Sequence, residues 1–395
     1  MTALSSNPWT RAAGWLAAWD AHGNHRTATA GDDAGADWLA AEAAALGADV
    51  AIEEFAIERL DPVAAFLEIG SERIAAIPAF DAPATGSDGV AGRLGPIGSD
   101  AEIVVAELPP QAVYSGEYER LRRTGSRGSA HRGGFVIVCA GHSPGMALLN
   151  AERFRDPFGA PAIHVSSAAR EAVLAAAASR APARLVADSR RVMASARNVV
   201  VSLDGADRSD AGAPLVVMTP RSSWWQSTAE RGGGIVCWLE SLRALLAAAP
   251  AGPVVFTANT GHELGHLGLD DFVARRPGWD RPANQGGAVW VHYGANIGAA
   301  GGNLSLVSPD DELRDLCAAE LARAGQPHAT APKDLVPSGE TRDIHRAGGR
   351  YLTLVGGNSR FHLPQDRWPD AVDVAAVTRI AAAAARIVPA LARGA

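Results

Sequence analysis

Short apolar runs alternate with longer helical patterns through the second half of the chain, and this alternation constrains the fold more than any other feature. Five runs have the length and composition of buried strands: residues 198–203, 215–218, 254–258, 288–292 and 351–355. Helical patterns lie between or after them, at residues 234–248, 310–324 and 371–390. Such alternation predicts an α/β fold, with a mostly parallel sheet sandwiched by helices. The 47% hydrophobic content is ample for packed cores.

The first half of the chain is organised differently. Residues 9–19 and 33–46 have helical patterns, and residues 48–57 have the pattern of a strand. From about residue 73 to 191, short strand-like runs separated by Gly, Pro and Ser follow one another too closely for regular strand–helix–strand units. We therefore expect a mostly β inserted domain at residues 73–190, within an α/β domain formed by residues 1–72 and 191–395.

Composition argues against several functional classes. Charged residues are 20% of the chain and the net charge is −7, without a long basic run, so we expect no nucleic-acid or membrane partner. The apolar stretches are short and interrupted by Arg, and the first residues lack the pattern of a secretion signal. Three scattered cysteines are too few for a disulfide framework or a cysteine-based metal site. We expect a cytoplasmic protein, and the sequence leaves homo-oligomerisation open.

Unusual polar residues gather in the loops that follow the predicted strands. In a parallel sheet, ligands bind beyond the carboxyl ends of the strands. These loops hold Arg221, Glu230, the run Gly261-His262-Glu263-Leu264-Gly265-His266 and the run Phe361-His362-Leu363-Pro364-Gln365-Asp366. His and Glu side chains that converge from separate strand ends predict a cation site.

The run from His262 to His266 also satisfies the HExxH pattern, in which two histidines on one helical face bind zinc and the Glu acts on water. The i, i+4 spacing makes this geometrically feasible. The extended metzincin form would need Gly and His at positions that hold Leu269 and Phe272. A zincin-like site, with His262 and His266 as ligands and Glu263 as base, is one alternative.

Taken in order, the segments resemble the co-catalytic zinc aminopeptidase family, whose relatives include the glutaminyl cyclases. The likeness covers nearly the whole chain, from the family's opening loop and helix at residues 25–38 through a protease-associated insert at about 73–191. Residues 230–234 fall where the family has Asp-Asn-Ala-Ser-Gly, and residues 261–268 fall where it has Gly-Glu-Glu-x-Gly-x-x-Gly. Residues 361–366 resemble its final Phe-His-Thr-Pro-x-Asp, the most specific of these motifs.

Several ligand positions depart from the family pattern. The first zinc histidine of the family's His-x-Asp falls on Thr219 or Pro220, and the Asp falls on Arg221 or Ser222. The Asp ligand after the following strand falls on Ala295. One of the two metal positions thereby loses the ligands that bind only that metal, so the resemblance implies a degenerate site.

The other metal position keeps a full set of ligands by this resemblance: Glu230, Glu263 and His362. Glutaminyl cyclases are similar, because they hold one zinc with Asp, Glu and His. The resemblance thus implies one zinc ion per chain, or another divalent metal, and it places His262 at the general-base position, where it would move the proton. Arg221, near the vacated position, is expected to orient an anionic group of a small-molecule substrate.

These features predict a metal-dependent hydrolase-type enzyme that acts on a small amide or amino-acid-derived molecule, with the inserted domain covering the cleft. A non-catalytic relative that uses the cleft for binding is an alternative, as is the zincin-like site. Lyase or cyclase chemistry on the same scaffold also stays open, because Lewis-acid activation alone does not determine the reaction.

Overall fold

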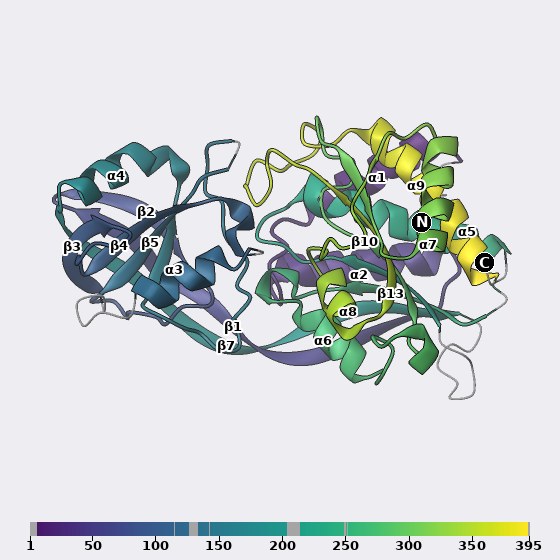
Figure 1. Ribbon diagram of the computed structural model, residues 1–395, viewed down its shortest axis with the longest axis horizontal. Coiled ribbons are helices and arrows are strands. Elements are labelled where there is room, and N and C mark those ends of the chain that lie inside the picture. Colours follow the sequence, from purple (N-terminus) through teal and green to yellow (C-terminus); the bar gives the residue numbers. More distant parts are fainter. Residues whose placement is uncertain are drawn as a thin grey trace.

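A long antiparallel ribbon joins the two lobes of the protein (Figure 1). The structure is a computed structural model that describes residues 6–113, 115–125, 133–141, 143–203, 214–248, 250 and 252–393. The ribbon consists of β1 (Val50–Ile69) and β7 (Pro182–Leu203). Both strands are much longer than predicted, because the strands expected at residues 48–57 and 198–203 continue into the second lobe.

The pairing of the ribbon contains one irregularity. Pro62 lies opposite Ser189 and Ala64 opposite Asp188, so Val63 between them has no partner on β7. The side chain of Val63 is 59% exposed. This β-bulge lies within β1, and bulges of this kind bend and twist a strand.

The larger lobe is built on a sheet with the strand order β1-β7-β9-β8-β10-β13-β11-β12. The strands beyond the ribbon are β8 (Leu215–Pro220), β9 (Val254–Asn259), β10 (Val289–Tyr293), β11 (Leu304–Val307), β12 (Ala329–Thr330) and β13 (Arg350–Gly356). The four central strands β9, β8, β10 and β13 are parallel, whereas β7 and β11 pair with them antiparallel. The predicted α/β fold is confirmed, with antiparallel strands toward the edges of the sheet.

Helices cover both faces of this sheet. One face packs against α1 (Pro8–Ala21), α2 (Ala30–Ala45), α5 (Gly233–Ala248), α7 (Asp311–Arg323) and α9 (Val374–Ala392), and the other against α6 (Leu267–Ala274) and α8 (Thr341–Ala347). Successive side chains of a strand point to opposite faces, so Val199 and Val201 join the first core and Val200 joins the second. By length and composition, α9 is the one described helix that could cross a membrane; half of its most apolar window is buried here, and it contacts α5, α7 and α1.

The smaller lobe contains β2 (Glu72–Pro78), β3 (Val90–Pro96), β4 (Ile103–Leu108), β5 (Gly134–Cys139) and β6 (Ala162–Val165), with α3 (Glu117–Gly125) and α4 (Arg170–Ala178). Its strands pair in the order β1-β2-β6-β5-β4-β3-β7, and the pairing of β1 with β7 in the ribbon joins the two ends of this series. The short strand-like runs at residues 102–108, 134–139 and 162–165, which belong to those predicted within residues 73–190, are observed as β4, β5 and β6. The resemblance of this lobe to a protease-associated domain stays a prediction.

One segment of the smaller lobe docks on the loops of the larger one. The backbone of Ala151 donates to the carbonyl of Glu263 at 2.8 Å, and the indole of Trp224 donates to Asn150 at 3.1 Å. The carbonyl oxygen of Leu148 lies 2.6 Å from Nδ1 of His362. Two residues expected in the active site, Glu263 and His362, therefore also hold the two lobes together.

Two histidines are buried as neutral rings. His25 stacks on Trp19 with ring centroids 3.6 Å apart, and His164 lies in the smaller lobe, where its Nε2 accepts the backbone N–H of Leu149. Burial, with a smaller contribution from the charge of Arg221, lowers the pKa of His25 from 6.5 to about 3. Burial, with a contribution from Arg122, lowers the pKa of His164 to about 3 as well.

These two rings are expected to make the protein sensitive to acid. Below pH 6.5 the unfolded chain binds a proton at each histidine that the folded chain does not bind until about pH 3. Each group therefore lowers the free energy of unfolding by about 1.4 kcal/mol per pH unit as the pH falls through this window, and its contribution is complete above pH 6.5. Urea unfolding at several pH values measures the slope. The variant His25→Phe, which keeps an aromatic ring against Trp19, should reduce the slope by one group's share; an unchanged slope would contradict the assignment.

Candidate metal site

The loops that follow the parallel strands form a pocket at one edge of the sheet. Loop residues after β9, β10 and β13 line it, together with the segment before α8 and Gln111 from the smaller lobe. The cavity has a volume of about 170 Å³. Its ionisable lining side chains are His262, His292 and Glu340, and its amide side chains are Gln111, Asn296 and Asn358.

The HExxH run does not form one helix, which corrects the helical setting of the zincin-like alternative. His262–Leu264 make a single 3₁₀ turn, and α6 begins only at Leu267. Between them Gly265 and His266 have φ angles of 84° and 62°, in the left-handed region. A Cβ at Gly265 would lie 2.9 Å from the carbonyl oxygen of Glu152, so this contact with the docked segment favours glycine.

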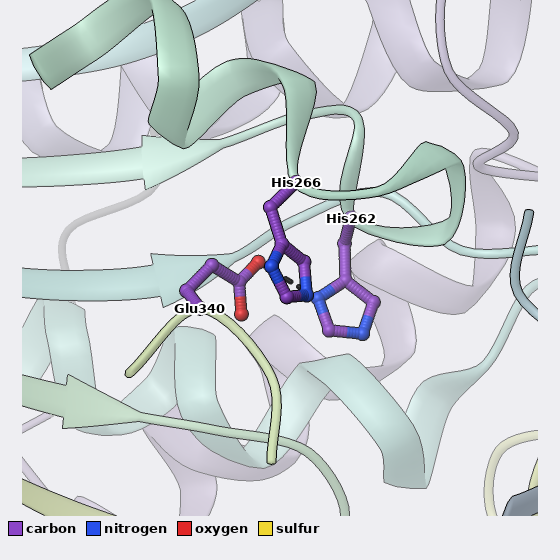
Figure 2. A group of neighbouring side chains, drawn as sticks. All are labelled: His262, His266 and Glu340. Atoms are coloured by element: carbon purple, nitrogen blue, oxygen red, sulfur yellow. Dashed lines mark hydrogen bonds and ion pairs between the residues drawn. The ribbon is translucent and has the colours of Figure 1, made fainter. Parts of the chain in front are cut away.

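The broken turn nevertheless brings His262 and His266 together. Their ring centroids are 5.1 Å apart, and Figure 2 shows both rings and the side chain of Glu340 pointing toward one another. Nδ1 of His262 lies 2.7 Å from Oε1 of Glu340. Among the described residues, His262, His266 and Glu340 are the group of three that offers potential ligand atoms within 4.8 Å of one another.

Neighbouring side chains fix this group and leave some of its atoms without partners. Nδ1 of His266 lies 2.6 Å from Oδ2 of Asp343, and Nδ1 of His292 bonds to the hydroxyl of Thr341. Nε2 of His292 lies 3.4 Å from Oε2 of Glu340. Nε2 of His266, Nε2 of His292 and Oε2 of Glu340 are buried and have no hydrogen-bond partner.

The charges of the group are set by burial and by its own contacts. Burial, followed by the charge of Arg231, lowers the pKa of His262 to about 4. Burial alone would raise the pKa of Glu340, but His262 and the neighbouring histidines hold that pKa well below its usual value. At neutral pH the pair is therefore a carboxylate beside a neutral imidazole, and a set of two nitrogens and one carboxylate suits zinc.

The set of ligands implied by the resemblance does not come together in the same way. Oε1 of Glu230 lies 3.6 Å from Nε2 of His362, so these two are neighbours. Glu263 is not part of that cluster, because its Oε1 accepts from the backbone and hydroxyl of Thr27 at 2.7 Å each and its Oε2 accepts from Ser222 at 2.6 Å. The carboxylate of Glu263 ties the opening loop to the sheet edge. Among the described residues, Glu230, Glu263 and His362 are not a group whose ligand atoms all lie within 4.8 Å of one another.

Arg221 also differs from its predicted position. The side chain is fully buried, and its Nη1 atom lies 2.7 Å from Oδ1 of Asp32. The same guanidinium donates to the carbonyl oxygens of Asp32 and Arg197. It does not line the pocket, so it cannot clamp an anionic substrate there. Burial raises the pKa of Asp32 to about 6, although the charge of Arg221 opposes this rise.

Sequence reasoning missed three residues of this region: Glu340, Asp343 and Arg231. Glu340 and Asp343 begin α8 and belong to no recognisable motif, so no local signal marks them. Arg231 falls where the zinc aminopeptidase motif has Asn, and that departure is visible in the sequence beside Glu230.

Comparison with known proteins supports the fold rather than the details of the site. No protein-family model matches the sequence, and no curated protein has significant similarity to it. A zinc aminopeptidase from Bacillus subtilis has a similar structure (TM-score 0.74, 16% identity, 96% of this chain and 95% of that chain). So does an M28 peptidase precursor from Shewanella amazonensis (TM-score 0.75, 15% identity, 98% and 94%). The glutaminyl cyclase of Porphyromonas gingivalis is more distant (TM-score 0.50, 11% identity, 97% and 98%). The chain therefore has the fold of the zinc aminopeptidases, a scaffold that glutaminyl cyclase shares.

Proposed function

We propose that this protein is a metal-dependent hydrolase-type enzyme that binds one divalent cation, zinc by preference, with His262, His266 and Glu340. The observation that carries the proposal is the convergence of these three buried side chains, whose ligand atoms lie within 4.8 Å of one another. In this arrangement Glu230, Glu263 and His362 do not hold the metal, and His262 is a ligand instead of the general base.

The surroundings of the three residues support a metal site over an ordinary polar cluster. A histidine that binds a metal usually has its other ring nitrogen bonded to a carboxylate or carbonyl, which fixes the ring. Asp343 has this position relative to Nδ1 of His266, and Nε2 of His266 is left buried without a partner. Leaving a buried polar atom unpaired costs free energy, so a cation at this point would relieve that cost for His266 and Glu340 together.

The pocket beside the group supports a small substrate. Bound zinc would polarise a substrate carbonyl or lower the pKa of a water molecule. The amide side chains of Asn296, Asn358 and Gln111 can orient an amide-like or amino-acid-derived molecule, and His292 lies beside Glu340 to hold or move a proton. None of the described residues that line the pocket is Arg or Lys, so the proposal no longer includes an anionic substrate group.

Metal content is the direct test. The purified chain, loaded with zinc chloride and dialysed against metal-free buffer, is expected to retain one zinc ion, measured by inductively coupled plasma mass spectrometry. His266→Ala is expected to retain none. The matched control is His345→Ala, because His345 lies on α8 but bonds to the hydroxyl of Tyr351 outside the group. A wild-type chain without zinc, or a fully loaded His266→Ala variant, would contradict the proposal.

A second test addresses Asp343, which orients a ligand without being one. Asp343→Asn is expected to weaken zinc binding by about 10–100-fold, the usual cost of losing such a partner. Competition with a zinc-binding dye measures the affinity. Asp271→Asn, which removes a carboxylate paired with Arg275 on α6, is the control and should leave the affinity unchanged. Equal affinities in all three proteins would count against a metal at His266.

A non-catalytic binding protein is the second candidate. It is favoured by the position of Glu230 and His362, two expected ligands that are fully buried and do not line the pocket. The charged side chain of Arg231 lies 2.7 Å from Glu230. A wild-type chain that retains no zinc and hydrolyses no aminoacyl amide, but still binds such molecules, would favour this candidate over the enzyme.

A further inference from the structure

We infer that the side chain of Arg231 takes the place of a metal ion between Glu230 and His362, and that this position accepts a divalent cation only when the guanidinium is removed. Glu230, Arg231 and His362 are electrostatic neighbours of the His262–His266–Glu340 group, because the charge of Arg231 acts on His262. The inference nevertheless does not require a metal ion bound to that group.

The three residues meet in the interior from two elements. Glu230 and Arg231 lie on a short π-helical turn, Thr228–Gly232, directly before α5, and His362 lies in the loop after β13. All three side chains are at most 1% exposed. Nη2 of Arg231 lies 2.7 Å from Oε1 of Glu230, and Nε2 of His362 lies 3.6 Å from the same oxygen.

The hydrogen bonds of the group leave its inward-facing atoms without partners. Nε of Arg231 donates to the carbonyl of Ser222 at 2.8 Å, but neither Nη atom makes a well-aligned hydrogen bond. Both carboxylate oxygens of Glu230 and Nε2 of His362 lack hydrogen-bond partners as well. Nδ1 of His362 is 2.6 Å from the carbonyl of Leu148 and must donate to it, so a neutral His362 presents a lone pair at Nε2.

This arrangement of acceptors is the kind that binds a cation. A buried carboxylate oxygen of Glu230 lies 3.6 Å from the imidazole lone pair, and the imidazole is oriented through its other nitrogen by a carbonyl, as in metal sites. The cation beside this oxygen is the guanidinium of Arg231, which is always charged in proteins. The Coulombic attraction of Arg231 holds the pKa of Glu230 below its usual value in spite of burial.

A divalent ion does not fit while Arg231 is present. An ion bound to Oε1 of Glu230 would compete with a fixed positive charge already 2.7 Å from that oxygen, in a place that water does not screen. The third ligand expected from the resemblance, Glu263, is committed to Thr27 and Ser222. The zinc that the fold suggests for Glu230 and His362 is therefore excluded in this chain by one of its own side chains.

Removing the guanidinium tests the inference. Arg231→Asn is expected to retain one more zinc ion per chain than the wild type after loading with zinc chloride and dialysis. Arg231→Lys, which keeps the positive charge, should gain none, and Arg231→Asn combined with His362→Ala should lose the gain. Zinc should also raise the melting temperature of Arg231→Asn more than that of the wild type, because the added ion would neutralise Glu230.

Two results would overturn the inference. One is a folded Arg231→Asn variant, judged by circular dichroism, that retains the same amount of zinc as the wild type. The other needs no change at Arg231: His362→Ala in the wild-type background should leave the zinc content unchanged, and a loss would mean that a metal already binds there. A wild-type chain that retains no zinc removes the proposed hydrolase site but leaves the gain in Arg231→Asn to be measured, so the two proposals fail separately.

Discussion

Replacing Arg221 with methionine is expected to destabilise the fold by about 3–5 kcal/mol, the cost of removing one partner from a buried ion pair. Asp32 would remain fully buried without its charged partner, and would have to stay unpaired or take up a proton, although Ala28 and Thr260 still donate to it. Methionine keeps much of the volume of arginine, so the loss reports charge rather than a cavity. Urea unfolding with linear extrapolation measures the free energy of unfolding.

Two further variants complete this experiment. Asp32→Asn combined with Arg221→Met should recover much of the lost stability, because the buried charge is then absent. Arg275→Met is the matched control, since Arg275 makes its ion pair with Asp271 near the surface, where such pairs contribute about 0–1 kcal/mol. If Arg221→Met were as stable as the wild type but impaired in binding an anionic ligand, the substrate-clamp role predicted from the sequence would be correct and the structural role wrong.

Replacing Glu340 with glutamine is expected to lower both zinc affinity and kcat/KM by at least about 100-fold, because the only carboxylate of the proposed ligand set is lost. Activity would be measured on the aminoacyl amide that the wild type hydrolyses fastest, and affinity by competition with a chelator. Glutamine has nearly the same shape and can still hydrogen-bond to His262, so the fold should persist. The melting temperature checks this.

The control for this prediction is Glu312→Gln, which removes an exposed carboxylate on α7 that pairs with Arg350 at the start of β13. It should leave affinity and activity unchanged. A Glu340→Gln variant that loses activity but keeps full zinc affinity would show that Glu340 acts on His262 as a positioning residue rather than as a ligand.

The sequence was most informative where physical rules are local. Apolar runs bounded by turns predicted the central strands, and the observed β9 extends the run at residues 254–258 by a single residue. The rule that parallel strands end at one edge then placed His262, Glu230 and His362 in one region. The resemblance to the zinc aminopeptidases was confirmed at the level of the fold.

The sequence was least informative where contacts between distant segments decide the side-chain positions. Glu340 reaches His262 from 78 positions away and lies in no motif. Glu263 fits two metal motifs, yet its carboxylate accepts from Thr27, 236 positions away, and it does not line the pocket. The HExxH run could be a helix by spacing, but Gly265 and His266 adopt left-handed φ angles that break it. Glu152, 113 positions away, then lies so close to Gly265 that glycine is favoured there, and no pattern within five residues reveals that contact.

The unpaired Val63 also governs which side chains of β1 enter each core. On the face shared with Val201 and Val199, β1 contributes its even-numbered residues, such as Val50 and Ile52; past the bulge the same face takes odd-numbered ones, such as Leu67 opposite Leu185. The one extra residue thus reverses which alternate side chains of β1 lie on this face of the sheet. Without the bulge, Glu68 would lie on the face that Leu67 now occupies. β1 can therefore contribute apolar side chains to the cores of both lobes only because one extra residue, Val63, lies between its two halves.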